Sequence, residues 1–291
     1  MLIRLGYDIR FATSGEVPIL TLLNVHPSRK KDLREADELR TEPAVKIENF
    51  EDSFGNHACR LIAPPGGIRL QNTTLIEDSG QLDEADLNAE ELPVERLPVE
   101  VLPYLMNSRY CEVDLLSNTA VELFWNVPKG FRRVQAITEW VHNKVTFGYE
   151  FANTTRTALG VYTERIGVCR DFQHLAITFC RALNIPARYA TGYLGDIGVP
   201  PAPCPMDFSA WFEAYLGGRW WSFDARHNAR RIGRVLMATG RDATDCAITT
   251  SFGRAKLISF QVTTDEVQES SAQESGVNIN VDANANELSV T

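Results

Sequence analysis

Cys169 stands where a cysteine can act as a nucleophile. In the run GVCRDFQHLAITFCRAL it follows Gly167 and opens a predicted helix. The free N–H groups and partial positive charge at a helix N-terminus stabilise a thiolate, and the same N–H groups can form part of an oxyanion hole for an acyl-transfer intermediate. An inert buried residue is the alternative, because that is the usual state of a free cysteine.

A predicted β-hairpin supplies polar side chains to the same region. Gly217 and Gly218 separate FSAWFEAYL from RWWSFDAR, and two glycines predict a two-residue turn because both can take positive φ without steric cost. Pairing Leu216 with Arg219 and continuing back along both strands gives one polar face, formed by Ser209, Trp211, Ser222, Asp224 and Arg226. The apolar face is formed by Phe208, Ala210, Phe212, Ala214, Leu216, Phe223 and Ala225. Asp224 lies diagonal to position 209, where a carboxylate could orient a base.

The helix and hairpin together read GVCRDFQHLAITFCRALNIPARYATGYL and DFSAWFEAYLGGRWWSFDARHN. They resemble the bacterial transglutaminase-like family, whose members are often described as cysteine proteases, over most of residues 120–255. The resemblance implies a papain-like α+β fold, with Cys169 as nucleophile and Asp224 as orienting acid of a Cys-His-Asp triad. No metal or organic cofactor is implied. The strand-rich N-terminal segment resembles the region that accompanies this domain in bacteria.

The catalytic histidine of that family falls at Ser209 in this chain. A serine hydroxyl cannot be the general base near neutral pH, because a base should titrate near the working pH, as histidine does. His227 is the nearest substitute, but in regular register it points away from the Asp224 face, so it serves only if the strand bends after Ala225. Core or surface roles are expected for His174, His142 and His57.

Two further residues are candidates for binding substrate. Arg226 would face Ser209 across the hairpin and could stabilise the Cys169 thiolate, while an ion pair with Asp224 is the alternative. Trp211 could line a cleft with its neighbours on the hairpin, although aromatic residues on strands more often serve packing.

The chain divides into three predicted regions. Residues 1–105 alternate short apolar runs with turn residues and end in an acidic, proline-spaced connector, which favours a β-sandwich-like domain. Residues 106–260 form the catalytic-type domain, with an amphipathic helix over residues 131–145 and another after Cys169. Residues 261–291 lose periodicity and are expected to form a disordered acidic tail.

Composition narrows the possible partners. The net charge is -9, and six of the acidic residues fall in residues 261–291. The rest of the chain has no stripe of basic residues that could bind nucleic acid. Six scattered cysteines without a CxxC pair argue against a metal site or redox motif and favour free thiols. No apolar run is long enough to cross a membrane or to act as a secretory signal, so we expect a cytoplasmic protein.

Three functions fit these observations. The first is a thiol amidase or peptidase that is acylated at Cys169 and acts on peptide or glutamine-type amide bonds, with water or an amine resolving the thioester. The second is a catalytically impaired relative, with Ser209 replacing the histidine, that binds a peptide or protein in the cleft. The third is a structural partner that uses the β-rich unit and the acidic tail.

Overall fold

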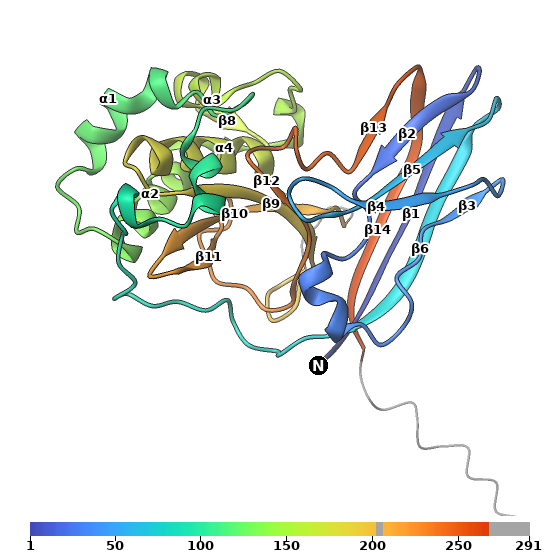
Figure 1. Cartoon of the computed structure of the whole chain (residues 1–291), viewed down its shortest axis with the longest axis horizontal. Coiled ribbons are helices and arrows are strands. Elements are labelled where there is room, and N and C mark those ends of the chain that lie inside the picture. Colours follow the sequence, from blue (N-terminus) through green and yellow to red (C-terminus); the bar gives the residue numbers. More distant parts are fainter. Residues whose placement is uncertain (202–205, 268–291) are drawn as a thin grey trace, which may run out of the picture.

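The computed structural model describes residues 1–201 and 206–267. It contains a β-sandwich, a second mixed unit with a central antiparallel sheet, and helices on the far side of that sheet (Figure 1). The predicted α+β class with a β-rich N-terminal region is therefore confirmed. No helix in these two ranges is long and apolar enough to cross a membrane.

Two four-stranded antiparallel sheets form the sandwich, in the orders β14-β1-β6-β3 and β13-β2-β5-β4. Their strands are β1 (Leu2–Thr13), β2 (Val17–Thr21), β3 (Arg40–Glu42), β4 (Glu48–Glu51), β5 (His57–Ala63), β6 (Ile68–Glu77), β13 (Thr249–Ser251) and β14 (Ala255–Val267). Strand β1 shows why these segments pair, since Ile3, Leu5, Tyr7 and Ile9 alternate with more polar residues and are all buried. The apolar face of each sheet is thereby removed from water.

Strand β14 revises the predicted C-terminal boundary. It pairs with β1 along its whole length, from Leu2 with Val267 to Thr13 with Ala255. The expectation of a disordered tail is therefore wrong for residues 261–267, whose alternating Val262 and Thr264 are buried in the sandwich. The rest of the predicted tail, residues 268–291, lies outside the described residues.

The second unit is built around the sheet β11-β10-β9-β12. Its elements are α1 (Val113–Phe124), α2 (Phe131–Lys144), β7 (Thr146–Phe147), α3 (Ala158–Glu164), β8 (Ile166–Gly167), α4 (Cys169–Ala182), β9 (Ala187–Leu194), β10 (Ser209–Leu216), β11 (Arg219–Phe223) and β12 (Arg234–Gly240). Short 3-10 segments lie at Pro27–Asp32, Val94–Arg96, Val99–Leu105 and Tyr149–Phe151. The helices predicted over residues 131–145 and after Cys169 are confirmed as α2 and α4.

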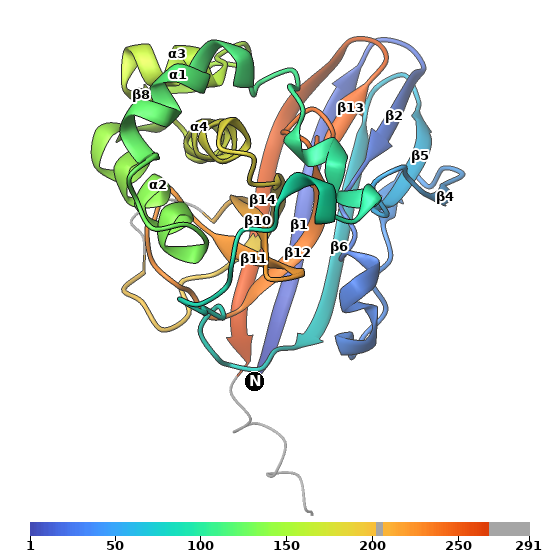
Figure 2. The same ribbon diagram turned by 60° about the vertical axis from the view of Figure 1, so that its left-hand side comes forward.

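Helix α4 is the centre of this unit, as Figure 2 shows end-on. Every residue from Asp171 to Arg181 is buried, between the sheet on one side and α1, α2 and α3 on the other. The predicted hairpin is also confirmed, with Leu216 opposite Arg219 and Glu213 opposite Ser222. Its apolar face packs toward α4, except for Phe208.

Phe208 corrects the predicted apolar face. Its ring contacts Tyr193 (ring centroids 5.0 Å apart), Tyr7 (6.4 Å) and Phe260 (5.7 Å), so it joins the core of the sandwich instead of the helical core. Val235 and Met237 of β12 belong to the same cluster. The central sheet is thus covered by helices on one face and by the sandwich on the other, which fixes the two units together.

The described cysteines are free, as predicted. Four are buried, namely Cys59, Cys111, Cys180 and Cys246, and Cys169 is partly exposed. Cys204 lies outside the described residues.

Candidate active site

The turn before α4 sets the position of Cys169. A Cβ atom on Gly167 would lie 2.6 Å from the Cβ of Asp171, so only glycine permits this approach. The Asp171 carboxylate accepts a hydrogen bond from the N–H of Val168 at 3.0 Å, which holds the residue before the helix against its first turn. Cys169 is therefore the first residue of α4, as the sequence predicts.

The thiol of Cys169 is neutral at rest. Desolvation raises its pKa to about 11, although the residue keeps part of its surface in contact with solvent. The charge of Arg226 and the N–H of Arg170 act in the opposite direction, and the charge of Asp207 adds to the rise. A thiol in this state becomes a nucleophile only if a neighbouring group accepts its proton.

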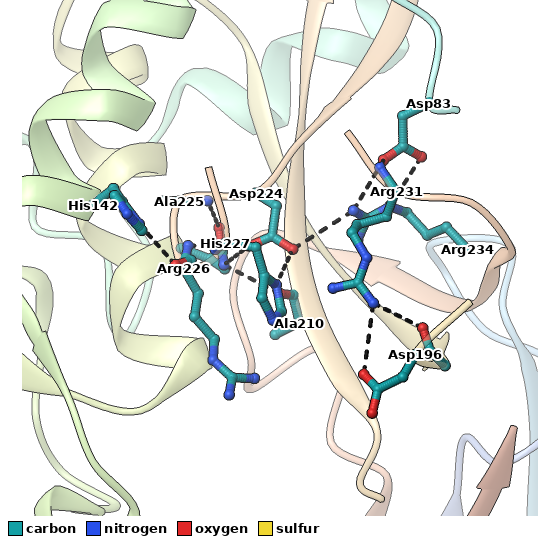
Figure 3. A network of polar contacts seen from close by, with 12 residues as sticks. Asp83, His142, Asp196, Ala210, Asp224, Ala225, Arg226, His227, Arg231 and Arg234 are labelled. Atoms are coloured by element: carbon teal, nitrogen blue, oxygen red, sulfur yellow. Dashed lines mark hydrogen bonds and ion pairs between the residues drawn. The ribbon is translucent and has the colours of Figure 1, made fainter. Parts of the chain in front are cut away.

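A histidine paired with Asp224 lines the same pocket as Cys169. Strand β11 ends at Phe223, and the chain turns through residues 225–227. The N–H groups of Arg226 and His227 donate to Asp224 Oδ1 at 3.0 and 3.1 Å, and His227 Nδ1 donates to Asp224 Oδ2 at 2.9 Å (Figure 3). The chain thus leaves the strand two residues earlier than the bend after Ala225 that the sequence required, and His227 still reaches Asp224.

The Asp224 carboxylate is buried yet charged. Burial alone would raise its pKa, but the hydrogen bond from His227 and the charges of Arg234 and His227 outweigh that effect, so that the pKa lies well below its usual value. An ionised carboxylate on Nδ1 keeps a proton on that nitrogen and leaves Nε2 free to accept one. Asp224 thereby orients an imidazole three residues further along the chain.

Gln173 ties this pair to the helix that carries the thiol. It lies one turn after Cys169, on the same side of α4. Its Nε2 donates to the carbonyl of Ala210 at 3.1 Å and to Asp224 Oδ1 at 3.3 Å, and its Oε1 accepts from the N–H of Ala225 at 3.1 Å. One buried carboxamide thus fixes the helix, the hairpin and the turn relative to one another.

Cys169 and His227 line the same pocket, which has a volume of about 70 Å³. Ser209 and four charged residues share its wall, namely Asp196, Asp207, Arg226 and Arg231. Within the described chain the Ser209 hydroxyl is buried and has no hydrogen-bond partner. The pocket therefore combines a thiol, an oriented imidazole, a free hydroxyl and charges of both signs.

Residues 118–225 match the transglutaminase-like superfamily. A candidate cysteine protease from Cytophaga hutchinsonii, of known crystal structure, is 33% identical to this chain, with a TM-score of 0.79, and the alignment covers 92% of this chain and 91% of that protein. The chain belongs to the transglutaminase-like superfamily. An uncharacterised protein of Mycobacterium leprae is 29% identical over 119 residues, which are 40% of this chain and 42% of that protein. The match thus spans less than half of that relative.

This membership makes Ser209 the main departure within the site. The residue lines the pocket at the position where the resemblance places the family's histidine, and the histidine that Asp224 holds is His227. The order along this chain is therefore cysteine, aspartate, histidine. The roles of these residues in catalysis remain predictions.

Arg226 is not where the hairpin register placed it. The ladder between β10 and β11 ends at the pair Phe212 and Phe223, so Arg226 does not oppose Ser209 in it. Its guanidinium lies over the Phe147 ring, 3.9 Å from the centroid, and its carbonyl accepts from His142 Nδ1 at 2.8 Å. The predicted ion pair with Asp224 is also wrong, because the contact runs through the backbone N–H.

Trp211 does not line the pocket. Only 1% of its surface is exposed, and its ring packs on Gly192 of β9, where a Cβ would lie 3.0 Å from Cη2. The Arg234 guanidinium lies 4.7 Å from the centre of the Trp211 rings. The predicted role in substrate binding is replaced by packing within the sheet.

The remaining candidate bases have other partners. His174 is fully buried, stacks on Tyr110 with ring centroids 4.8 Å apart, and accepts from the N–H of Ala243 at 3.1 Å. His57 lies in β5, with Nε2 3.0 Å from Asn49 Oδ1. No group of three or more His, Cys, Asp or Glu side chains among the described residues could hold a metal ion.

Three residues at the site were not predicted. Gln173 could have been found, because it is four residues after Cys169 and so shares its helix face. Arg234 and Asp83 carry no such signal, since Arg234 meets Asp224, and Asp83 meets Arg234, only through the tertiary fold.

Proposed function

We propose that this protein is a cysteine-dependent amide hydrolase or acyltransferase in which Cys169 attacks, His227 is the general base and Asp224 orients His227. The observation that carries this proposal is the 2.9 Å contact between His227 Nδ1 and Asp224 Oδ2, in a pocket that His227 shares with Cys169. In this proposal His227, paired with Asp224, takes the role of the histidine that is absent from position 209.

The proposed reaction begins with the neutral thiol. As Cys169 Sγ bonds to the carbonyl carbon of an amide, its proton moves to His227 Nε2, and the oxygen becomes an oxyanion near the first N–H groups of α4. Collapse breaks the C–N bond, while the imidazolium gives its proton to the leaving amine. A thioester on Cys169 remains.

Water or a second amine resolves the thioester. His227 takes a proton from the attacking group, the C–S bond breaks, and the thiol leaves with a proton returned by His227. Water gives a carboxylic acid and an amine gives a new amide. The small pocket, about 70 Å³, suits the reacting acyl group alone, so we propose that a peptide or protein substrate lies across its mouth.

A second candidate is a binding module that keeps the cleft without turnover. The pKa of about 11 for Cys169 favours it, because such a thiol is almost entirely protonated at neutral pH. The two candidates differ in whether His227 changes the reactivity of Cys169.

The test is acylation by p-nitrophenyl acetate, followed as release of p-nitrophenolate. The proposal predicts a burst of one equivalent that is lost in Cys169→Ala and strongly slowed in His227→Ala, while His57→Ala behaves as wild type. A blocked glutaminyl-glycine dipeptide with and without hydroxylamine then separates hydrolysis from amine transfer. The binding module is favoured instead if wild type and His227→Ala acylate equally slowly.

A further inference from the structure

The acidic connector between the sandwich and the second unit reaches the active site. It runs along the lower edge of the molecule in Figure 1, from β6 toward α1. Asp83 of this connector exchanges two hydrogen bonds with Arg231, since its N–H donates to the Arg231 carbonyl and its Oδ2 accepts from the Arg231 N–H, both at 2.9 Å. The connector is thereby fixed to the chain segment that follows His227.

The Asp83 carboxylate holds the side chain of Arg234. Arg234 Nε lies 3.1 and 3.2 Å from its two oxygens, and Arg234 Nη2 lies 3.1 Å from Oδ2 (Figure 3). Both partners are nearly buried, with 12% of the Asp83 side chain and 5% of the Arg234 side chain exposed. A desolvated, multiply bonded pair of this kind has a defined geometry.

The same guanidinium faces the catalytic carboxylate. Arg234 Nη2 lies 3.6 Å from Asp224 Oδ2, the oxygen that accepts the 2.9 Å hydrogen bond from His227. At 3.6 Å the guanidinium stabilises the negative charge of Asp224 without a short hydrogen bond to it. Oδ2 is left to His227.

We propose that Asp83 is a positioning residue for the Asp224–His227 pair: by binding Arg234 it prevents that guanidinium from closing on Asp224 Oδ2 and competing with His227. Without the Asp83 charge, Asp224 is the nearest carboxylate left to a buried cation, and the attraction between them draws the two together. His227 then loses part of its hold on Oδ2. The inference rests on the proposed function only for its effect on reactivity.

Other charged groups lie close to the network of Asp83, Arg234 and Asp224. Arg231 Nη2 donates to the Gly195 carbonyl at 2.8 Å and lies 3.7 Å from Asp196. On the other side, Arg226, Asp207 and Cys169 line the pocket together with His227. Asp83→Asn keeps a side-chain oxygen that can accept from the Arg231 N–H, so this change removes chiefly the negative charge that faces Arg234.

The experiment replaces Asp83 and observes His227 directly. In Asp83→Asn we expect the rate of Cys169 alkylation by iodoacetamide to fall by about 10- to 100-fold, the loss that removal of an orienting partner typically causes at histidines that bind metals. Nitrogen-15 NMR of the His227 ring should show loss of the Nδ1–H tautomer.

The control is Glu91→Gln. Glu91 lies on the same connector and pairs with Arg133 at 3.1 Å, with side-chain exposures of 12% and 3% that match those of Asp83 and Arg234, but it does not contact Asp224. It should leave the His227 tautomer and the alkylation profile unchanged. If Asp83→Asn does not fold, Asp83→Glu is the second variant. It keeps the negative charge, so it should retain most of the wild-type Nδ1–H tautomer of His227.

A double-mutant comparison gives a second test of the role of Asp83. If Asp83 acts through Arg234, the double variant Asp83→Asn/Arg234→Gln should be no slower than Arg234→Gln alone. The inference is overturned if Asp83→Asn folds and keeps the wild-type tautomer, whatever the alkylation rate. Failure of the proposed function gives a different result. Cys169 would then be alkylated at the same rate in His227→Ala and in wild type, and the NMR comparison of Asp83→Asn with wild type would still decide the role of Asp83.

Discussion

Replacement of His227 by alanine tests the proposed mechanism most directly, and its effect can be worked out from the burial of the thiol. With a pKa of about 11, an unassisted Cys169 at about pH 7.5 is thiolate to the extent of about 10^(7.5−11), or roughly 3 × 10⁻⁴. A free cysteine of pKa about 8.5 is roughly 10% thiolate at the same pH. Cys169 without a base should therefore react about 300-fold more slowly than a free thiol.

With His227 present the proton has an acceptor in the pocket. General-base assistance typically contributes about 10²- to 10⁴-fold, so we expect wild-type Cys169 to be alkylated about 10²-fold or more faster than in His227→Ala at neutral pH. The wild-type rate should depend only weakly on pH above neutrality, because the base in the pocket removes the thiol proton. In the variant it should keep rising with pH toward the range in which the buried thiol itself ionises.

The assay is the pseudo-first-order rate of iodoacetamide labelling at Cys169 from about pH 5 to 10, followed by mass spectrometry of the Cys169 peptide. His57→Ala is the matched control, because that histidine lies in the sandwich and hydrogen-bonds Asn49. Equal rates and equal pH profiles for wild type and His227→Ala would refute the assignment of His227 as base.

Three further predictions concern the groups around the thiol. Asp224→Asn should lower turnover of p-nitrophenyl acetate by up to about 10⁴-fold, because the asparagine favours the wrong tautomer of His227. Because the folded-state pKa of Asp224 is lowered, its contribution to stability is present above about pH 4 and is lost as the pH falls. In urea unfolding from pH 3 to 7, the free energy of unfolding of the variant should therefore fall less steeply toward acid pH than that of wild type. Gln173→Met should lower the free energy of unfolding by about 2–5 kcal/mol, since the Ala225 N–H and the Ala210 carbonyl lose their partner; a change under about 0.5 kcal/mol in urea would contradict this. Native Cys180 should resist iodoacetamide at pH 9, because burial raises the pKa of its thiol, and peptide mapping that finds it labelled before unfolding would show the helix to be open.

Much of the fold follows from local pattern. Apolar residues at helical spacing predict α2 and α4, and the Gly217-Gly218 turn predicts the hairpin with its register, because these signals depend on residues close in sequence. Strand β14 escaped prediction because its partner, β1, lies at the other end of the chain. Its last seven residues, QVTTDEV, predict a tail unless β1 is known to present a free edge.

The site was predictable where it depends on position within an element. Cys169 begins its helix, and Asp224 lies at the end of the hairpin, as expected. The capture of His227 was not predictable from register, because it depends on the backbone leaving the strand after Phe223 and turning around the Asp224 carboxylate. The contact of Arg234 with Asp83 spans 151 positions and has no local signature.

The two oxygens of Asp224 have different partners, and this allows the proposed base to come from position 227 instead of position 209. Oδ1 is held by the N–H groups of residues 226 and 227 and by Gln173, so the carboxylate cannot rotate. Oδ2 is then fixed beside the pocket and available to an imidazole from any segment that reaches it. In this chain the turn that supplies two of the N–H groups also carries His227, so one local structure both immobilises the Asp224 carboxylate and delivers the proposed base. Because Oδ2 already accepts the hydrogen bond from His227, the carboxylate has an imidazole partner without a histidine at position 209.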